Sequence, residues 1–289
     1  MVLDSLRDQI AGRVRSGVVG RPDAAAVRRE EIFDAPGPRW FGPDAPICRI
    51  HADSAMFVGG LRALLLQSLH PLAMAGVAEH SDYQHDPWGR LQRTADFLAA
   101  TTYGPIPEAE LAIARVRAVH DHVTGVASDG RPYAANDPHL LRWVHIAEID
   151  SFLAAYRRYG ASSLAPGEAD RYVADAAVVA RRLGVPAPPE SERALRDQIR
   201  MYRGELEGTP EARRAARYLL IEPPMHPVAR APYTVLAAAA VALLPRWARW
   251  PLRLPYLPVA EAVVVRPAGE ALTRTLRWAL QRPPEPAPG

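Results

Sequence analysis

Two arginines and a threonine lie at helical spacing in the stretch HDPWGRLQRTADFLAATTYG, residues 85–104. Arg90, Arg93 and Thr94 are three and four positions apart, so a helix would place them on one face. The residues after Thr94 are almost entirely apolar, which indicates that this helix runs toward the protein interior. Two guanidinium groups on one side of such a helix need either a ligand that accepts charge-assisted hydrogen bonds or carboxylates such as Asp86.

Histidine offers a second candidate chemistry, because a neutral imidazole in apolar surroundings is a common ligand of haem iron. His120 lies near the end of a predicted helix in LAIARVRAVHDHVTG, and the apolar spacing there should leave it partly buried. His122 is two residues on and faces another direction. His145, in LLRWVHIAEID, is either a ligand or a hydrogen-bonded core histidine. The other histidines are His51, His70, His80, His85, His139 and His226.

The segment EHSDYQHD, residues 79–86, concentrates side chains that bind metals. His80 and His85 with Asp82 or Asp86 could hold non-haem iron or zinc. Their spacing matches no firm metal signature such as H-E-x-x-H. A polar loop between two helices, with Ser81 or Asp82 capping the next element, explains the same residues.

Other catalytic signatures are missing from the sequence. No G-x-S-x-G, P-loop or G-x-G-x-x-G motif occurs. All 35 basic residues are arginine, so no lysine can act as a Schiff-base amine or a general base. Cys48 is the single cysteine and cannot form an internal disulfide. The arginines are dispersed along the chain, which argues against a nucleic-acid partner.

Apolar residues recur with helical periodicity, and no convincing period-two alternation predicts a strand. We therefore predict one all-α domain over residues 46–282, preceded by an N-terminal helical extension (1–45) and followed by a frayed tail (283–289). The predicted helices cover about 2–16, 23–33, 47–69, 71–80, 88–103, 107–124, 137–159, 167–183, 190–206, 209–219, 228–244 and 256–280.

Short-range signals mark several of the predicted helix ends. Capping side chains should begin three helices, and glycines should end three. The capping residues are Asp137 before Pro138, Ser191 and Thr209, and the terminal glycines are Gly125, Gly160 and Gly184.

Composition indicates a globular protein with a sizeable core. The chain has 289 residues, of which 48% are hydrophobic and 23% charged, and its formal net charge is +3. The longest apolar run, 235–244, is shorter than the roughly 20 residues of a membrane span. Trp and Arg residues after this run could lie at a lipid interface, so peripheral membrane contact is an option. The N-terminus lacks the apolar stretch of a secretory signal, and we expect a cytoplasmic protein.

The block from Gly59 to Gly104 resembles the oxygenase MpaB family, relatives of the latex-clearing rubber oxygenases. The motifs RVRAVHDHVTG from Arg115 and YAANDPHLLRWVHIAEIDSFLAAYRRYG from Tyr133 continue the resemblance in the same order. The order of these motifs is specific, whereas "HP" or "RxxRT" alone is not.

This resemblance implies a globin-like helical core around a central apolar pocket that holds haem b. In the rubber oxygenases an Arg-x-x-Lys-Thr segment lies on the distal side of the haem, and a later histidine is the proximal iron ligand. By this pattern Arg90, Arg93 and Thr94 would be the catalytic distal residues. Arg90 and Arg93 would also contact the haem, and His120 would ligate the iron. The substrates would be dioxygen and an apolar molecule, for example an unsaturated one.

Two distal positions depart from the rubber oxygenases. Arg93 stands in place of the lysine and cannot lose its proton. Met74 stands about where those enzymes have a glutamate proposed as a base, and the nearest carboxylate is Glu79. These departures argue against rubber cleavage itself.

Three functions are therefore open. The first is a haem-dependent oxygenase with His120 as iron ligand. The second is a non-haem metal enzyme that uses the 79–86 segment. The third is a cofactor-free helical protein that binds a lipid or a partner through an apolar groove including residues 233–258.

Overall fold

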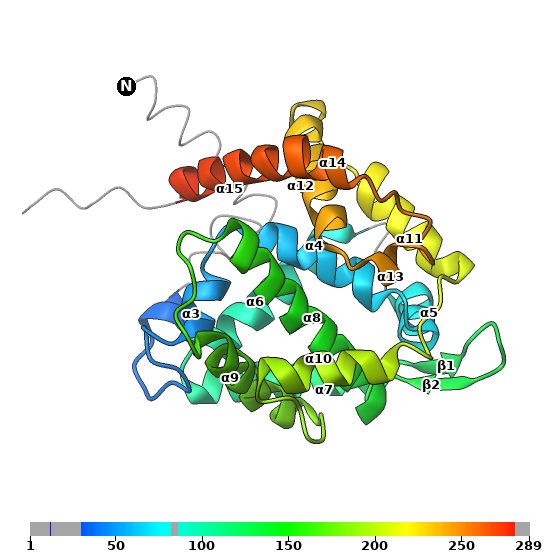
Figure 1. The fold of residues 1–289 in the computed structure, drawn as a ribbon. Helices are drawn as coiled ribbons and strands as arrows, with labels where there is room; N and C mark the ends of the chain where they lie inside the picture. The colour runs from blue at the N-terminus through cyan, green and yellow to red at the C-terminus, as the bar shows by residue number, and fades with distance from the viewer. Residues whose placement is uncertain (1–11, 13–29, 82–85, 281–289) are drawn as a thin grey trace, which may run out of the picture.

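A computed structural model describes residues 12, 30–81 and 86–280, whose regular secondary structure is helical apart from one short β-hairpin (Figure 1). The predicted all-α class is confirmed. The predicted helix at 2–16, most of the one at 23–33 and the tail lie outside the described residues. The elements are η1 (Glu30–Asp34), α3 (Pro46–His51), α4 (Met56–Gln67), α5 (Pro71–His80), α6 (Pro87–Tyr103), α7 (Ile106–His120), β1 (Thr124–Val126), β2 (Pro132–Ala134), α8 (Pro138–Tyr159), α9 (Glu168–Leu183), α10 (Glu192–Tyr202), α11 (Pro210–Ile221), α12 (Pro227–Leu243), α13 (Arg246–Arg249), α14 (Pro258–Ala260), η2 (Glu261–Val265) and α15 (Arg266–Leu280).

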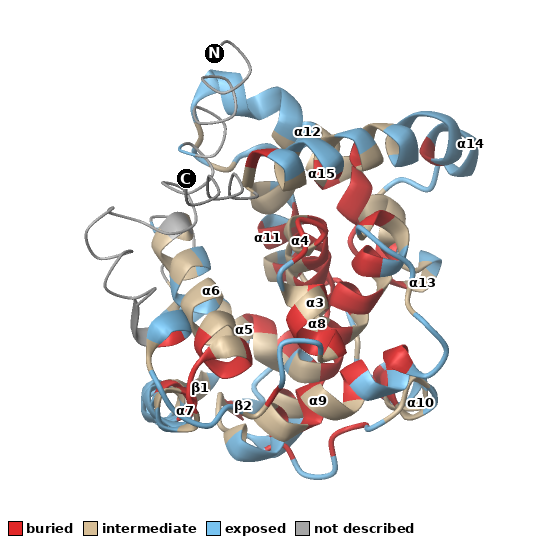
Figure 2. Cartoon of the chain, turned by 90° about the vertical axis from the view of Figure 1, so that its left-hand side faces the viewer, coloured by how far each residue is buried: buried red, intermediate tan, exposed pale blue. Residues whose placement is uncertain are grey.

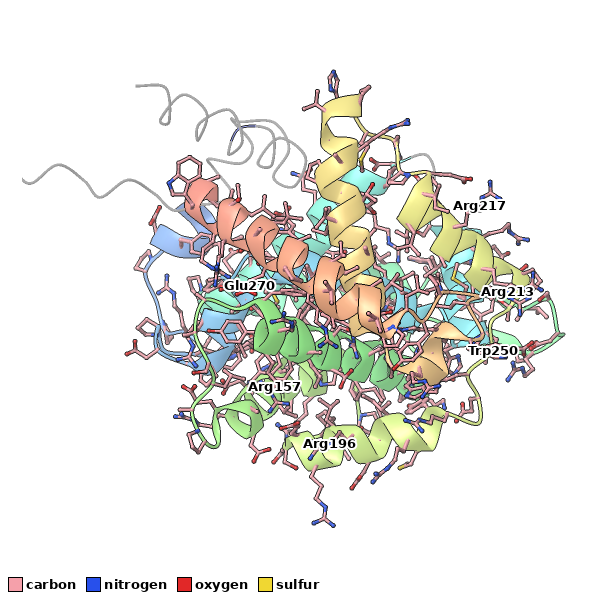
Figure 3. The ribbon with its side chains drawn as sticks, turned by 45° about the horizontal axis from the view of Figure 1, so that its top comes forward. Arg157, Arg196, Arg213, Arg217, Trp250 and Glu270 are labelled. Atoms are coloured by element: carbon pink, nitrogen blue, oxygen red, sulfur yellow. The ribbon has the colours of Figure 1, made fainter. Side chains whose placement is uncertain are left out.

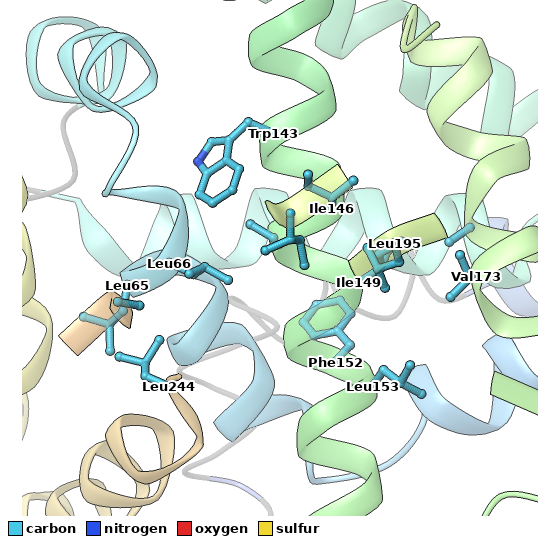
Figure 4. Packing of buried hydrophobic residues seen from close by; sticks show 14 of the residues in the cluster. Leu65, Leu66, Trp143, Ile146, Ile149, Phe152, Leu153, Val173, Leu195 and Leu244 are labelled. Atoms are coloured by element: carbon cyan, nitrogen blue, oxygen red, sulfur yellow. The ribbon is translucent and has the colours of Figure 1, made fainter. Parts of the chain in front are cut away.

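Helix α8 forms the centre of the core, and α4 packs along it (Figure 4). Leu65 and Leu66 of α4 belong to the same buried cluster as Trp143 and Phe152 of α8. Gly59 permits the close approach of the two helices, because a Cβ at this position would lie 2.9 Å from the Phe152 ring. Burying each of these large apolar side chains contributes about 1.5–3 kcal/mol to stability.

One buried arginine joins α4, α8 and α12. Arg62 donates to Asp150 over 2.7 Å and to the Ser151 hydroxyl over 2.6 Å, both on α8. Its Nε donates to the carbonyl of Leu243 at the end of α12, over 3.0 Å. With all these partners in place the buried charge is compensated, as a charge in a core must be.

The predicted capping signals are confirmed at five positions. Asp137, Ser191 and Thr209 each accept a hydrogen bond from a backbone N–H two or three residues later, at the starts of α8, α10 and α11. Gly160 and Gly184 follow α8 and α9, and Gly184 has the left-handed φ of +104° that favours glycine.

The β-hairpin corrects two predictions. The helix predicted over 107–124 ends at His120, and Gly125 lies in strand β1 instead of ending a helix. The strands pair antiparallel, with Gly125 opposite Tyr133. Each strand has three residues, so the alternation that marks a strand is too short to see in the sequence.

One predicted helix is interrupted in the structure. The 47–69 segment breaks between α3 and α4, where the Asp53 carboxylate accepts from Ala55 N over 2.8 Å and from Ala161 N over 2.9 Å. Contacts with distant residues such as Ala161, which no local pattern reveals, contribute to this break. The predicted 256–280 helix is continuous from Pro258 to Leu280, as α14, the π-helical η2 and α15.

Buried residues concentrate in α4, α8 and the helices around them, while the first half of α12 and all of α14 are largely exposed (Figure 2). The globin-like arrangement around an apolar pocket stays a prediction. Within the described residues, no single helix is long and apolar enough to cross a bilayer. Helices α4 and α5 meet that test only together, and the chain bends by 107° between them.

Candidate functional site

The sequence-predicted site residues lie on two helices that are linked through the end of α5. Arg90, Arg93 and Thr94 occupy the first turns of α6, and His120 is the last residue of α7. Ser81, just after α5, accepts a hydrogen bond from Arg90 over 2.8 Å. His80, the last residue of α5, is 3.1 Å from the carbonyl of Thr124, four residues after His120.

The start of α6 is fixed by its own cap. The Asp86 carboxylate accepts from Gly89 N over 2.9 Å, and Pro87 occupies the first helical position. Arg93 lies 3.3 Å from the same carboxylate and its side chain is 69% exposed. The Thr94 hydroxyl donates to the carbonyl of Arg90 over 3.0 Å. The structure thus places these arginines and the threonine at the surface end of α6. Of the two kinds of partner that the sequence allowed for the arginines, a ligand or a carboxylate, Arg93 has the carboxylate of Asp86.

The interior part of α6 packs against α7. Ala100 and Ala112 are buried together with Ile32, and Phe97 and Tyr103 pack against them. Small side chains at the contact allow the two helices to approach closely. This apolar contact holds α6 and α7 together near the turn that joins them.

His120 is half-buried, and its Nδ1 atom is buried without a hydrogen-bond partner. Burial lowers the pKa of the imidazole, and Asn136 and Asp121 oppose this effect. Desolvation therefore favours the neutral ring, which is the form that ligates a metal. His122 is exposed and lies in the turn after the end of α7.

His145 lies on α8 with its Nε2 atom buried and without a hydrogen-bond partner. Burial lowers the pKa of this histidine to about 4. It is a second neutral imidazole in the interior, on a different helix from His120.

The 79–86 segment is described only in part, because Asp82 and His85 lie outside the described residues. The described members have structural partners. His80 bonds to the hairpin backbone, and Glu79 accepts a short hydrogen bond from the Tyr133 hydroxyl. Met74, at the position of the rubber-oxygenase glutamate, is buried in the main core.

A buried polar group that the sequence did not reveal lies between α3, α6, α8 and α9. His51 Nδ1 is 2.9 Å from the Thr102 hydroxyl, and its Nε2 is 3.4 Å from the Tyr172 hydroxyl. Burial lowers the pKa of His51 to about 4 and raises that of Glu148 on α8 to about 7. No sequence signal could have found this group, because its members come from four separate helices.

A cavity of about 460 Å³ opens between α7 and α9. Ile113 and Arg117 line it from α7, Asp121 lines it just after α7, and Arg182 lines it from α9. The cavity has a charged rim, and His120 is not among its lining residues.

Comparison with known proteins supplies the observation that decides the family. The family model "ER-bound oxygenase mpaB/B'/Rubber oxygenase, catalytic domain" matches residues 48–278, which is most of the chain. The chain belongs to this MpaB/rubber oxygenase family. Neither a curated protein nor a solved structure matches it. The chain therefore carries an oxygenase-like catalytic domain, and RLQRT, His120 and His145 all lie inside the matched region.

Proposed function

We propose that this MpaB-family chain is a haem b-dependent oxygenase that uses dioxygen on an apolar substrate. The observation that carries the proposal is the buried, unpartnered Nδ1 atom of His120 within the oxygenase domain. A buried polar atom without a partner costs about 1–3 kcal/mol, and a ligand such as a metal ion is one explanation of such an atom. The neutral ring of His120 fits the chemistry of an iron ligand.

In this proposal His120 would ligate the iron, and Arg90, Arg93 and Thr94 would line the opposite side of the site. When bound, the haem supplies an iron centre able to activate dioxygen. The exposed Arg93–Asp86 pair contributes at most about 1 kcal/mol, so the Arg93 guanidinium can leave it at little cost to bind a carboxylate of the cofactor. Arg90, held by Ser81, provides a second positive charge.

The proposed proton chemistry differs from that of a rubber oxygenase. Arg93 stays protonated under all ordinary conditions, and the buried Met74 side chain holds no proton that can be exchanged. Arg90 and Arg93 can therefore donate hydrogen bonds but cannot act as bases. We propose an apolar substrate other than polyisoprene for this reason.

The absorption spectrum of the purified chain, expressed with added haem, tests the proposal. We expect a Soret band with one haem per chain, because His120 supplies a neutral ligand. His120→Ala should remove the band or reduce it strongly. The matched control His122→Ala changes an exposed histidine two residues away and should keep the band. A colourless wild-type protein after haem supplementation, or an unchanged spectrum of His120→Ala, would overturn the proposal.

A second candidate function is a cofactor-free protein that binds lipid or a partner through an apolar surface. The observation in its favour is the exposure of apolar side chains near the C-terminal end, where Trp250 is 87% exposed (Figure 3). The other exposed members are Leu257, Val259, Val263 and Val264. Cosedimentation with phospholipid vesicles, lost in Trp250→Ala, together with the absence of haem binding, would favour this function. The cytoplasmic location stays a prediction, which cell fractionation tests.

A further inference from the structure

Two histidines and a glutamate from three separate elements meet at one end of α8. His70 immediately precedes α5, His139 lies in the first turn of α8, and Glu205 follows α10. The backbone N–H of Glu207 donates to the carbonyl of Leu69 over 2.7 Å. This bond ties the end of α10 to the start of α5, so backbone packing holds the three side chains together.

The distances within this group suit a shared cation. One ligand atom from each residue lies within 4.8 Å of the others. The Oε2 atom of Glu205 is 2.7 Å from His139 Nε2 and 3.4 Å from His70 Nε2. Donor atoms around one zinc ion, with bonds of about 2.0–2.1 Å, lie roughly 3.3 Å apart. The His70 separation already has this value, and the partly exposed His139 and Glu205 need to separate by about 0.6 Å.

His70 is the least expected member, because it is buried without a hydrogen bond. Its side chain is 2% exposed, and neither ring nitrogen has a hydrogen-bond partner. The rings of Trp143, Tyr202 and His139 surround it at centroid distances of 6.0 to 6.4 Å. Its Nε2 atom faces the Glu205 carboxylate at 3.4 Å, which is too long for a good hydrogen bond, so this buried nitrogen is available to a metal ion between the two side chains.

The hydroxyl of Tyr202 sets the tautomer of His139. It donates to the carbonyl of His139 over 2.8 Å, so its single proton is used. It lies 3.2 Å from His139 Nδ1 and can only accept there, which makes Nδ1 the protonated nitrogen. In the neutral ring with this tautomer, the Nε2 lone pair faces the carboxylate of Glu205 at 2.7 Å. Two acceptors at this distance need a proton or a cation between them.

We propose that His70, His139 and Glu205 form a binding site for a divalent transition metal, with Zn²⁺ as the best-suited ion. Two histidines and one carboxylate are a donor set that holds catalytic zinc and leaves further positions open for water or another ligand. The Tyr202 hydroxyl plays the orienting role that a carboxylate or carbonyl plays behind many metal-bound histidines. None of these residues belongs to the RLQRT segment or to α7, so this site is independent of the proposed haem ligand.

The surroundings leave the site negative and accessible. The carboxylate of Glu205 supplies negative charge to the site. The neighbouring Arg131 is paired with Asp129 over 2.6 Å, which limits its repulsion of a cation. The side chains of His139 and Glu205 are 45% and 42% exposed, and they provide a path from solvent to the buried His70.

Metal titration of the full chain tests the site. Protein treated with a chelator and then dialysed is titrated with ZnCl₂ by calorimetry, and its zinc content is measured so that haem iron is not counted. We expect saturable binding of one Zn²⁺ per chain and a higher melting temperature. Co²⁺ in its place should give visible absorption typical of a nitrogen and oxygen ligand set. Absence of saturable Zn²⁺ binding would overturn the proposal and identify the group as a protonated histidine–carboxylate pair.

Conservative variants separate this site from general binding to acidic residues. Glu205→Gln and His139→Gln change exposed ligands and should weaken Zn²⁺ binding by at least about tenfold. Glu207→Gln is the matched control, an exposed glutamate two residues away that is outside the group, and should bind as wild type. Equal affinities for wild type and Glu205→Gln, or an equal loss in Glu207→Gln, would contradict the assignment.

Tyr202→Phe tests the positioning role of the hydroxyl. The ring that stacks on His139 is kept, and only the hydrogen bond that sets the tautomer is lost. We expect Zn²⁺ affinity to fall about 10- to 100-fold and the Co²⁺ spectrum to change. A variant with wild-type affinity and spectrum would show that the hydroxyl does not position the ligand.

Discussion

At the scale of single residues, the interior of the molecule holds titratable side chains with opposite pKa shifts. Burial lowers the pKa of His51 and His145 to about 4 and raises that of Glu148 to about 7. Desolvation disfavours the charged form in each case, which is why bases and acids shift in opposite directions. Near neutral pH both imidazoles are therefore uncharged, and Glu148 changes its charge.

Glu148 makes stability depend on pH in a direction that can be measured. In the unfolded chain this carboxyl has the ordinary pKa of 4.5, whereas in the folded protein the pKa is about 7. Between these values the unfolded state holds fewer protons, so the free energy of unfolding falls as pH rises from about 4.5 to about 7. Glu148→Gln removes this contribution. Denaturant unfolding measures this difference. From pH 4.5 to pH 8, the free energy of unfolding of the variant should rise by about 1 to 3 kcal/mol relative to that of wild type. The same change in the free energy of unfolding between the two pH values for both proteins would contradict this prediction.

At the scale of elements, helix ends follow local chemistry and helix contacts follow side-chain size. The caps at Asp137, Ser191 and Thr209 act over two or three residues, so the sequence alone predicts them. The pairing of α4 with α8 depends instead on which small residue faces which large one. Gly59 faces Phe152 there, and the next residue, Gly60, has open space around it.

Replacing each of the two adjacent glycines of α4 by alanine should have opposite effects on stability. Gly59→Ala adds a Cβ 2.9 Å from the Phe152 ring and 3.2 Å from Ala155, and it should destabilise the protein by about 1–3 kcal/mol. Gly60→Ala adds a methyl group into open space and should stabilise α4 by about 0.5–1 kcal/mol. Thermal unfolding of both variants checks the pair. Equal destabilisation would show that helix α4 does not pack on α8 through Gly59.

At the scale of the whole molecule, one buried carboxylate joins three distant parts of the chain. Asp53, between α3 and α4, accepts from Arg277 of α15 over 2.8 Å and from Ala161 N, beyond the end of α8, over 2.9 Å. Arg277 also donates to the carbonyl of Tyr159 over 2.8 Å. The Asp53 side chain is 4% exposed, so water cannot replace these partners.

Removal of the Asp53 carboxylate should lower the free energy of unfolding much more than removal of a more exposed carboxylate. Asp53→Ala leaves the Arg277 charge and two backbone N–H groups without their partner, and we expect a loss of about 3–5 kcal/mol. Glu270→Ala removes a partly exposed carboxylate of α15 that pairs with Arg274 over 2.7 Å and lies 3.9 Å from Arg158 of α8, and it should cost at most about 1 kcal/mol (Figure 3). Chemical denaturation of both variants measures the difference. Similar losses for the two would contradict a joining role for Asp53.

The sequence by itself determined the helical class, most helix ends and the membership of the oxygenase family. Periodicity, caps and terminal glycines involve residues within a few positions, and the order of the motifs around RLQRT and His120 identifies the family. The same local reasoning missed the β-hairpin and the break at Asp53, since paired strands of three residues and contacts across the fold leave no periodic signal.

Only the tertiary structure decided which polar side chains meet. His139 and Glu205 are 66 residues apart, and His70 is separated from both by several helices, yet packing of α5, α8 and α10 brings their ligand atoms within 4.8 Å. His51, Thr102 and Tyr172 meet in the same way from α3, α6 and α9. Helix periodicity fixes the face on which a residue lies, but the partner of that face depends on how complete helices pack.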